Sequence, residues 1–266
     1  MKGRVLIVAG SDSGGGAGIQ ADIKTVTALG GYAATAITGL TAQNTLGIDA
    51  VYSLPPEFVA RQMEAVLKDI GADAIKTGAL FDGDIIDAVA DTRERLAPYI
   101  PLIVDPVMVS SSGTRLLDER AVEKFKRRLL AHAAIVTPNL PEADVLLGRR
   151  VEGLDGMKEA AADLQRLGPR TVVVTGGHLA GPKLHDVVFD GRLPFVLDAE
   201  RIETRDTHGT GCTFASAVAT GIAQGLGVRS AIERAHHYVQ EAIRTAPGLG
   251  QGHGPLNHAH TMKDVS

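Results

Sequence analysis

The feature that most constrains the fold is a series of short, almost continuously apolar segments, each followed by a stretch with helical periodicity. Four of these segments, ADAIKTGAL, PLIVDPV, AAIVTPN and RTVVVTGG, predict strands that are buried on both faces. Such strands are typical of a parallel sheet covered by helices on each side. RVLIVA and YAATAIT predict two further strands before them. The pattern predicts one doubly wound α/β domain with three layers and a mostly parallel central sheet.

The segments between the strands predict helices. Ile19, Ile23, Val26 and Leu29 recur at helical spacing before a Gly-Gly stop, and Pro56 suits the first turn of the next helix. AQNTLGIDAVYSL predicts a polar turn and a short strand, and HDVVFDG with PFVLDAERI predicts an antiparallel edge hairpin. The remaining predicted helices are residues 83–96, 119–130, 157–167, 213–225 and 229–245.

Composition narrows the function classes. A formal charge of −4 and a pI near 6.1 argue against nucleic acid as the main partner. A single cysteine among 266 residues fits a reducing compartment. RVLIVA is too short for the apolar region of a signal peptide, and the uncharged span 207–228 contains too many polar and glycine residues to cross a membrane. We expect a cytoplasmic protein without membrane partners, with its domain over residues 1–260 and a loosely ordered tail over 261–266.

Polar and glycine residues follow each predicted strand at its carboxyl end, where ligands bind in open parallel sheets. The first such loop, GSDSGGGAG, lacks the lysine of a Walker A motif, and a dinucleotide fingerprint fits it poorly. A flexible strand-to-helix turn is the alternative interpretation. Asp12 and Asp22 are the polar residues best placed to meet a ligand there.

The stretch DTHGTGCT carries the lone cysteine just behind Gly209, Thr210 and Gly211. Small residues before an Ala-rich helix leave backbone N–H groups available at its positive end, which predicts an anion site. At the same helix terminus, the pKa of Cys212 is expected to fall. The alternative is a buried structural cysteine.

Two carboxylates lie at the ends of neighbouring predicted strands. Glu142 in TPNLPE either holds Mg²⁺ and its water shell or begins a helix, and Asp105 before Pro106 has the same two interpretations. The histidines lack the spacing of a zinc site. His236 and His237 are expected on a helix surface, and His253, His258 and His260 in the tail.

Taken together and in order, these motifs resemble the ribokinase-like fold, and more closely the bacterial hydroxymethylpyrimidine/phosphomethylpyrimidine kinases of thiamine biosynthesis. The resemblance covers nearly the whole chain to about residue 260. It rests on AGSDSGGGAGIQADIKT, TGLTAQNTLG, DPVMVSSSG, TPNLPEA, TGGH, DTHGTGCT and GHGPLNH.

The resemblance implies ATP-dependent, Mg²⁺-assisted phosphorylation of 4-amino-5-hydroxymethyl-2-methylpyrimidine and then of its monophosphate, by a homo-oligomer. Gln43 would hold the amino and ring nitrogens, since a carboxamide both donates and accepts. Asp22 would anchor the hydroxymethyl end or order the loop, and Cys212 would take the catalytic-base position, chiefly for the alcohol step. The remaining implied contacts are Gly10 and Val107 to substrate, Gly209, Thr210 and Gly211 as anion hole, and Asp105, Asn139, Glu142, Thr175, Gly177 and Thr207 to nucleotide and metal.

Three departures from the family pattern bear on the site. Ala79 stands where many relatives carry Met, Ser110-Ser111-Ser112 where many carry Lys, and Thr175 where some carry Lys. They predict a roomier pyrimidine pocket and fewer phosphate contacts. The alternatives are a pyridoxine or pyridoxal kinase of the same fold and a non-catalytic pyrimidine sensor; a nicotinamide dehydrogenase fits less well, because no acidic residue follows the glycine loop at ribose-binding spacing.

Overall fold

Nine strands form a single sheet in the order β3-β2-β1-β4-β5-β6-β7-β8-β9. The computed structural model describes residues 1–109 and 116–262. The six central strands, β2-β1-β4-β5-β6-β7, pair in parallel. At the edges, β3 pairs antiparallel with β2, and β8 pairs antiparallel with β7 and β9. The predicted mostly parallel sheet and the edge hairpin are confirmed. The strands are β1 (Arg4–Asp12), β2 (Tyr32–Asn44), β3 (Gly47–Ser53), β4 (Ala74–Thr77), β5 (Leu102–Val104), β6 (Ile135–Val136), β7 (Thr171–Val174), β8 (Lys183–Phe189) and β9 (Phe195–Glu200).

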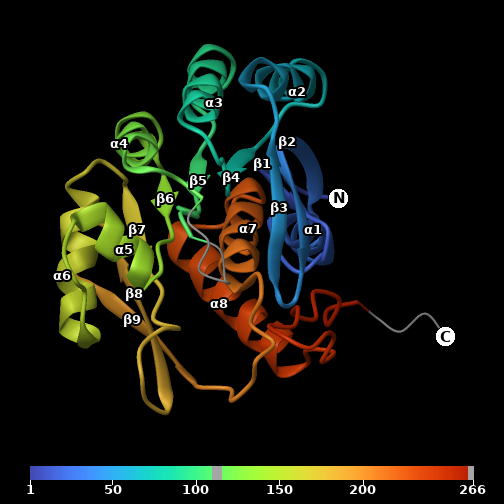
Figure 1. Cartoon of the computed structure of the whole chain (residues 1–266). Helices are drawn as coiled ribbons and strands as arrows, with labels where there is room; N and C mark the ends of the chain where they lie inside the picture. The colour runs from blue at the N-terminus through green and yellow to red at the C-terminus, as the bar shows by residue number, and fades with distance from the viewer. Residues whose placement is uncertain (110–115, 263–266) are drawn as a thin grey trace.

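Helices cover both faces of the sheet and complete the three predicted layers (Figure 1). One face carries α1 (Gly18–Ala28), α7 (Thr210–Ala223) and α8 (Val228–Arg244). The other carries α2 (Pro56–Asp69), α3 (Gly83–Leu96), α4 (Glu119–Arg128), α5 (Leu140–Leu147) and α6 (Gly153–Gln165), with a short 3₁₀ turn, η1, at Leu130–His132.

The alternation of side chains along β1 explains why its sequence is apolar throughout. Leu6 and Val8 pack into the core under α2–α6, whereas Val5, Ile7 and Ala9 pack into the core under α1, α7 and α8. All five are fully buried. Because both faces of β1 pack against a core, apolar residues are favoured at successive positions, and the period of two disappears from its sequence.

The element boundaries differ from the predictions at three functional places. α5 was not predicted as a separate helix, although Glu142 was considered as a helix start. α7 begins at Thr210, three residues earlier than predicted, so the Gly-Thr-Gly turn forms the helix start itself. β2 extends to Asn44, and a register shift between Ala42 and Gln43 interrupts its pairing with β3.

The segment after α8 packs against the domain, which corrects the placement of several histidines. His258 is buried, and its Nε2 lies 2.9 Å from Thr213 Oγ1. His236 is not a surface residue, because its Nδ1 lies 3.0 Å from Asp186 Oδ2 and only 12% of its side chain is exposed. Thr261 donates a hydrogen bond to the Ala28 carbonyl, and residues 263–266 of the predicted tail lie outside the described residues.

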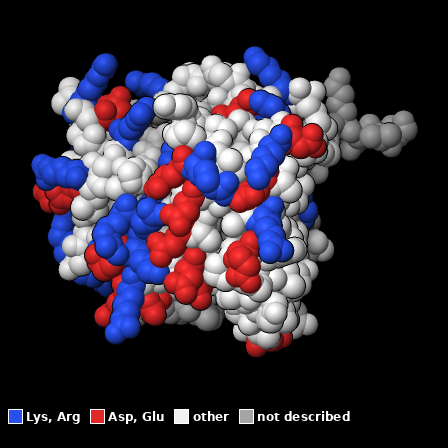
Figure 2. Space-filling view, turned by 90° about the horizontal axis from the view of Figure 1, so that it is seen from above, with Lys and Arg blue, Asp and Glu red and all other residues white. Residues whose placement is uncertain are grey.

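Charges of both signs alternate over the face seen from above in Figure 2, where α2, α3 and α4 lie. Arg128 contacts Asp87, Asp91 and Glu94 of α3, and Arg95 contacts Glu64 of α2. Acidic and basic side chains that alternate and pair in this way are typical of a solvent-exposed face. Among the described residues, no helix combines the length and apolar character that a membrane span requires.

Candidate active site

A cavity of about 550 Å³ opens at the carboxyl edge of the parallel strands. It includes residues that follow β1, β4, β5, β6 and β7, and the order of strands reverses between β1 and β4. Ligands bind at such a switch point because the loops diverge there and leave a crevice. Of the predicted site residues it contains Gly10, Gln43, Asp105, Val107, Asn139, Glu142, Thr175, Gly177, Thr207, Gly209, Thr210, Gly211 and Cys212.

The glycine loop after β1 is held in shape by the carboxylate of Asp12. Asp12 accepts hydrogen bonds from the backbone N–H groups of Gly14, Gly16 and Ala17 at 2.8, 3.0 and 2.8 Å, and it lies 2.9 Å from His208 Nε2. Burial disfavours its charge, but the bonds from His208 and the loop outweigh that effect and lower the pKa of Asp12 below its usual value. The loop is therefore a structured wall of the cavity.

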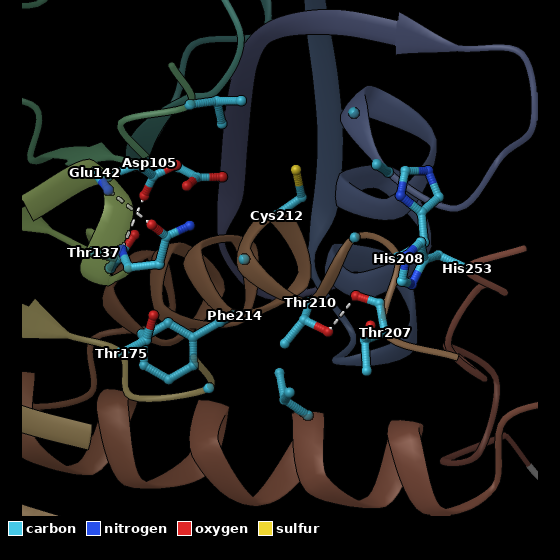
Figure 3. Close-up of a pocket in the computed structure, with 18 of the residues that line it drawn as sticks. Asp105, Thr137, Glu142, Thr175, Thr207, His208, Thr210, Cys212, Phe214 and His253 are labelled. Carbon is cyan, nitrogen blue, oxygen red and sulfur yellow. Dashed lines mark hydrogen bonds between the residues drawn. The ribbon is translucent and has the colours of Figure 1, made fainter. Parts of the chain in front are cut away.

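The Gly-Thr-Gly turn is packed against this loop. Gly209 has φ +83°, and a Cβ at that position would lie 1.9 Å from the Gly16 carbonyl oxygen, so only glycine fits. α7 follows directly, and the Thr210 hydroxyl donates to the Thr207 carbonyl at 2.7 Å (Figure 3). The positive end of α7 thus faces the cavity, as an anion site requires.

Cys212 lies at the centre of the cavity wall, half-buried, between the carboxylate side and the histidine side (Figure 3). The expectation of a lowered pKa is wrong. Burial raises the pKa of the thiol, and the charges of Asp105 and Asp22 add to this; the attraction of Lys76 and a bond from the Gly18 N–H do not compensate. The thiol keeps its proton at neutral pH.

A buried ion cluster lies under the cavity and argues against one of the two predicted roles of Asp22, contact with the hydroxymethyl end. The other role, ordering of the loop, stays a prediction. Lys76 Nζ lies 3.0 Å from Asp22 Oδ1 and 3.4 Å from Asp105 Oδ2, and Ser216 donates to Asp22 at 2.6 Å. Burial alone would lower the pKa of Lys76, but the two carboxylates outweigh it and raise the pKa. Asp22 has no exposed surface and does not line the cavity, so it cannot contact substrate there.

Glu142 and Asn139 form a capping box at the start of α5. The Asn139 side chain accepts the Glu142 N–H at 2.9 Å, and the Glu142 carboxylate accepts the Asn139 N–H at 2.9 Å. Glu142 therefore lies at a helix start, and this position does not exclude a contact with metal, which stays a prediction. Burial and the nearby charge of Asp105 raise the pKa of Glu142 well above its usual value.

The carboxylates of Asp105 and Glu142 fit a Mg²⁺ site. Asp105 Oδ2 is buried without a hydrogen-bond donor among the described residues, and its ion pair with Lys76 is long at 3.4 Å. Mg²⁺ takes one or two carboxylates and keeps water or phosphate oxygens as its other ligands. A larger cluster of His, Cys, Asp and Glu that could hold a metal is absent from residues 1–109 and 116–262.

The end of the cavity away from His208, called here the far end, holds three of the predicted nucleotide residues, Asn139, Thr175 and Gly177. Thr207 lies instead on the side of His208 (Figure 3). Asn139 and Thr175 form a parallel bridge at the ends of β6 and β7, and Thr175 N–H donates to the Pro138 carbonyl at 2.9 Å. Arg201 donates to the carbonyls of Gly177, Leu179 and Gly181, which fixes the loop after β7. Arg201 was missed, because β9 is distant in sequence and a lone arginine gives no local signal.

The end of the cavity beside His208, called here the near end, holds Gln43. Its backbone exchanges two 2.8 Å hydrogen bonds with the Ser13 hydroxyl, and its carboxamide nitrogen lies 3.3 Å from His208 Nε2. Ala79 and Phe81 line the same end, while Ser110–Ser112 lie outside the described residues. His208 was also missed, although DTHGTGCT contains it.

The chain is similar to kinases over nearly its whole length. The sequence profile described as phosphomethylpyrimidine kinase matches residues 12–257. The hydroxymethylpyrimidine/phosphomethylpyrimidine kinase of Bacillus subtilis is 43% identical, over 96% of this chain and 94% of that protein. The thiamine biosynthesis bifunctional protein ThiED of Geobacter sulfurreducens is 50% identical over 99% of this chain, which spans 54% of that longer protein.

A solved structure supports the same conclusion for the fold. The pyridoxal kinase from Staphylococcus aureus in complex with ADP matches with a TM-score of 0.90 and 34% identity, over 97% of this chain and 94% of that one. The predicted ribokinase-like fold is therefore correct. With a matching profile over most of the sequence and a relative at 43% identity that the match covers to 94%, the chain belongs to the phosphomethylpyrimidine kinase family.

Proposed function

We propose that this protein phosphorylates 4-amino-5-hydroxymethyl-2-methylpyrimidine with ATP and then phosphorylates the monophosphate to the diphosphate, in thiamine biosynthesis. The observation that carries the proposal is the position of the Gly209–Gly211 turn in one cavity with Gln43 at one end and the Asn139–Thr175 bridge at the other. An acceptor at Gln43 and a nucleotide at Asn139 and Thr175 would place the transferred group at the start of α7.

The residues divide the work of phosphoryl transfer. Backbone N–H groups at the start of α7 stabilise the charge that develops on the equatorial oxygens, and Gln43 orients the pyrimidine edge. Asp105 and Glu142 would hold Mg²⁺, which neutralises phosphate charge when it is bound. The Thr175 and Gly177 loop, fixed by Arg201, would contact the nucleotide.

Cys212→Ala is expected to slow phosphorylation of the alcohol by about 100-fold and phosphorylation of the monophosphate by less than about tenfold. The alcohol has a proton to lose and needs a group to orient it, whereas the second acceptor is already anionic. Since the thiol is protonated, it cannot act as the predicted base. It would accept a hydrogen bond from the hydroxyl and orient it, the proton would pass to an oxygen of the transferred phosphoryl group, and Cys212→Ser should recover much of the loss. Single-turnover measurements of each step test this; equal losses in both steps would contradict the proposed division.

The proposed activity is tested by ADP release with MgATP and each of two alcohols, the aminopyrimidine and pyridoxal. We expect release that depends on the pyrimidine, followed by a second equivalent as the diphosphate forms. Faster release with pyridoxal would favour the pyridoxal kinase alternative, which the structural neighbours make the main rival. Tight pyrimidine binding without ADP release would indicate a sensor.

We further propose a cytoplasmic homo-oligomer, on the grounds of the single cysteine and the exposed edge of the sheet. β3 is exposed along most of its length and presents Val51 and Tyr52 to solvent, with Leu40 of β2 beside it. Exposed apolar edge strands are pairing surfaces that proteins usually cover.

A further inference from the structure

A buried imidazole–carboxylate pair links the separate segments of the near end of the cavity. The side chains of His208 and Asp12 are 8% and 4% exposed, and His208 Nε2 lies 2.9 Å from Asp12 Oδ2. The two residues are 196 positions apart in sequence. The same Nε2 lies 3.3 Å from the carboxamide nitrogen of Gln43. His208, which directly precedes the anion turn, therefore contacts both the glycine loop, through Asp12, and the end of β2, through Gln43.

The location of one proton in this pair follows from its chemistry. An ionised carboxylate only accepts hydrogen bonds, and Asp12 already accepts three from backbone N–H groups of its loop. His208 Nε2 must therefore carry a hydrogen, which it donates to Asp12. A ring nitrogen that carries a hydrogen has no lone pair, so it cannot accept a hydrogen bond from Gln43.

The carboxamide of Gln43 has an accepting end and a donating end. In the structure its oxygen lies 3.1 Å from the Thr41 hydroxyl, which also lies 3.1 Å from the Ser11 carbonyl, and its nitrogen faces His208. A turn of 180° would exchange the two ends and direct the oxygen at the Nε2–H of His208. Because Nε2 carries a hydrogen, the pair favours the turned orientation, in which the oxygen shares that hydrogen with Asp12. The carboxamide nitrogen can then donate to the Thr41 hydroxyl, which itself donates to the Ser11 carbonyl.

We propose that Asp12 and His208 determine substrate specificity by fixing the orientation of the Gln43 carboxamide. A fixed Nε2–H leaves Gln43 with a defined pattern of donor and acceptor toward the cavity. That pattern distinguishes a pyrimidine with an amino group at position 4 from one with an oxo group. Asp12 and His208 are positioning residues, because they act through Gln43. The inference rests on the proposed recognition of the aminopyrimidine edge by Gln43.

The test compares kcat/KM for the 4-amino substrate with kcat/KM for its 4-oxo analogue. Asp12→Asn has nearly the same shape, but the loop N–H groups use both carboxylate oxygens, Oδ1 for Gly14 and Oδ2 for Gly16 and Ala17. The new amide nitrogen must therefore oppose one of these N–H groups, and where it takes the place of Oδ2 the imidazole is no longer held as a donor. We expect this amino-over-oxo ratio to fall by about tenfold or more, the effect of one misdirected buried hydrogen bond. His208→Leu should lower the ratio similarly, whereas His208→Gln, which retains an N–H for Asp12, should keep most of it.

Gln20→Leu is the matched control. Gln20 accepts the Asp12 N–H at 2.9 Å and donates to the Ser11 hydroxyl at 2.8 Å, so its loss disturbs the same strand end without removing the imidazole–carboxylate pair. It should lower kcat/KM for both pyrimidines equally and leave their ratio unchanged. A merely structural role of Asp12 would give the same result for Asp12→Asn.

A double variant separates failure of this inference from failure of the proposed function. Gln43→Ala should remove most of the amino-over-oxo preference, and Asp12→Asn added to it should change the ratio no further. If Gln43→Ala leaves the ratio intact, the proposed recognition by Gln43 is wrong. If Gln43→Ala removes the preference but Asp12→Asn and His208→Leu preserve it, the positioning role is overturned.

Discussion

Gly209→Ala is expected to lower kcat by about 10²- to 10³-fold for both phosphorylation steps, the usual effect of losing an anion-hole donor. The new Cβ would lie 1.9 Å from the Gly16 carbonyl oxygen, so the turn and the glycine loop must separate. The backbone N–H groups that follow would then leave the position of the transferred phosphoryl group. Steady-state kinetics with each acceptor measure the effect, and both steps should suffer because both use the same turn.

Gly225→Ala provides a matched control for Gly209→Ala. Gly225 follows the other end of α7 and has nearly the same φ, +84° against +83°, but a Cβ there meets nothing within 4 Å. Both substitutions carry the similar backbone cost of a left-handed residue, about 1–2 kcal/mol. The temperature of thermal unfolding should therefore fall in both variants, whereas kcat should fall only in Gly209→Ala. Equal kcat in the two variants would refute the anion turn.

Lys76→Met is expected to reduce the free energy of unfolding by about 3–5 kcal/mol, the typical effect of breaking a buried ion pair from one side. Lys76 and Asp22 have no exposed side-chain surface, and Asp105 is 4% exposed. Removal of the ammonium leaves two carboxylates in the interior without a countercharge. Denaturant unfolding followed by circular dichroism measures the loss, and Asp22→Asn in the same chain should recover part of it by removing one charge.

Lys124→Met tests whether burial is the cause of this effect. Lys124 also contacts two carboxylates, Asp84 at 3.0 Å and Asp87 at 2.7 Å, but its side chain is 30% exposed and both partners are more so. Exposed ion pairs contribute about 0–1 kcal/mol. We therefore expect a small change for Lys124→Met; a loss as large as that of Lys76→Met would show that burial does not govern the difference.

The strands and the polar edge of the sheet could be predicted because each is encoded locally. Continuous apolar runs specify strands with a core on both faces, and the carboxyl ends of parallel strands meet at one edge. The residues that follow the strands, such as Asp105, Asn139 and Thr175, therefore lie in one cavity as expected. The glycine turn before α7 was also predicted, with the helix start placed three residues too late, since small residues before an apolar helix give a local signal.

Cys212 and Asp22 show where local reasoning fails. The position of Cys212 at a helix start predicts a lowered pKa, but burial raises it, and the charges of Asp105, after β5, and Asp22, in α1, add to this effect. Asp22 follows the glycine loop in sequence, yet the rotation of α1 directs it toward Lys76 and Ser216, under the site. Neither environment can be inferred from neighbouring residues, because the groups that create it come from other elements.

The amino-acid sequence alone determined the layers of this protein, the edge of the sheet that carries the site, and the turn at the start of α7. Only the tertiary structure decided that Cys212 keeps its proton, that Asp22 is a buried counterion, and that His208 meets Asp12 across 196 residues. The reason is the range of the forces involved. Backbone preference and hydrophobic period act between near neighbours in the chain, whereas burial and charge depend on whatever the fold brings within a few ångströms.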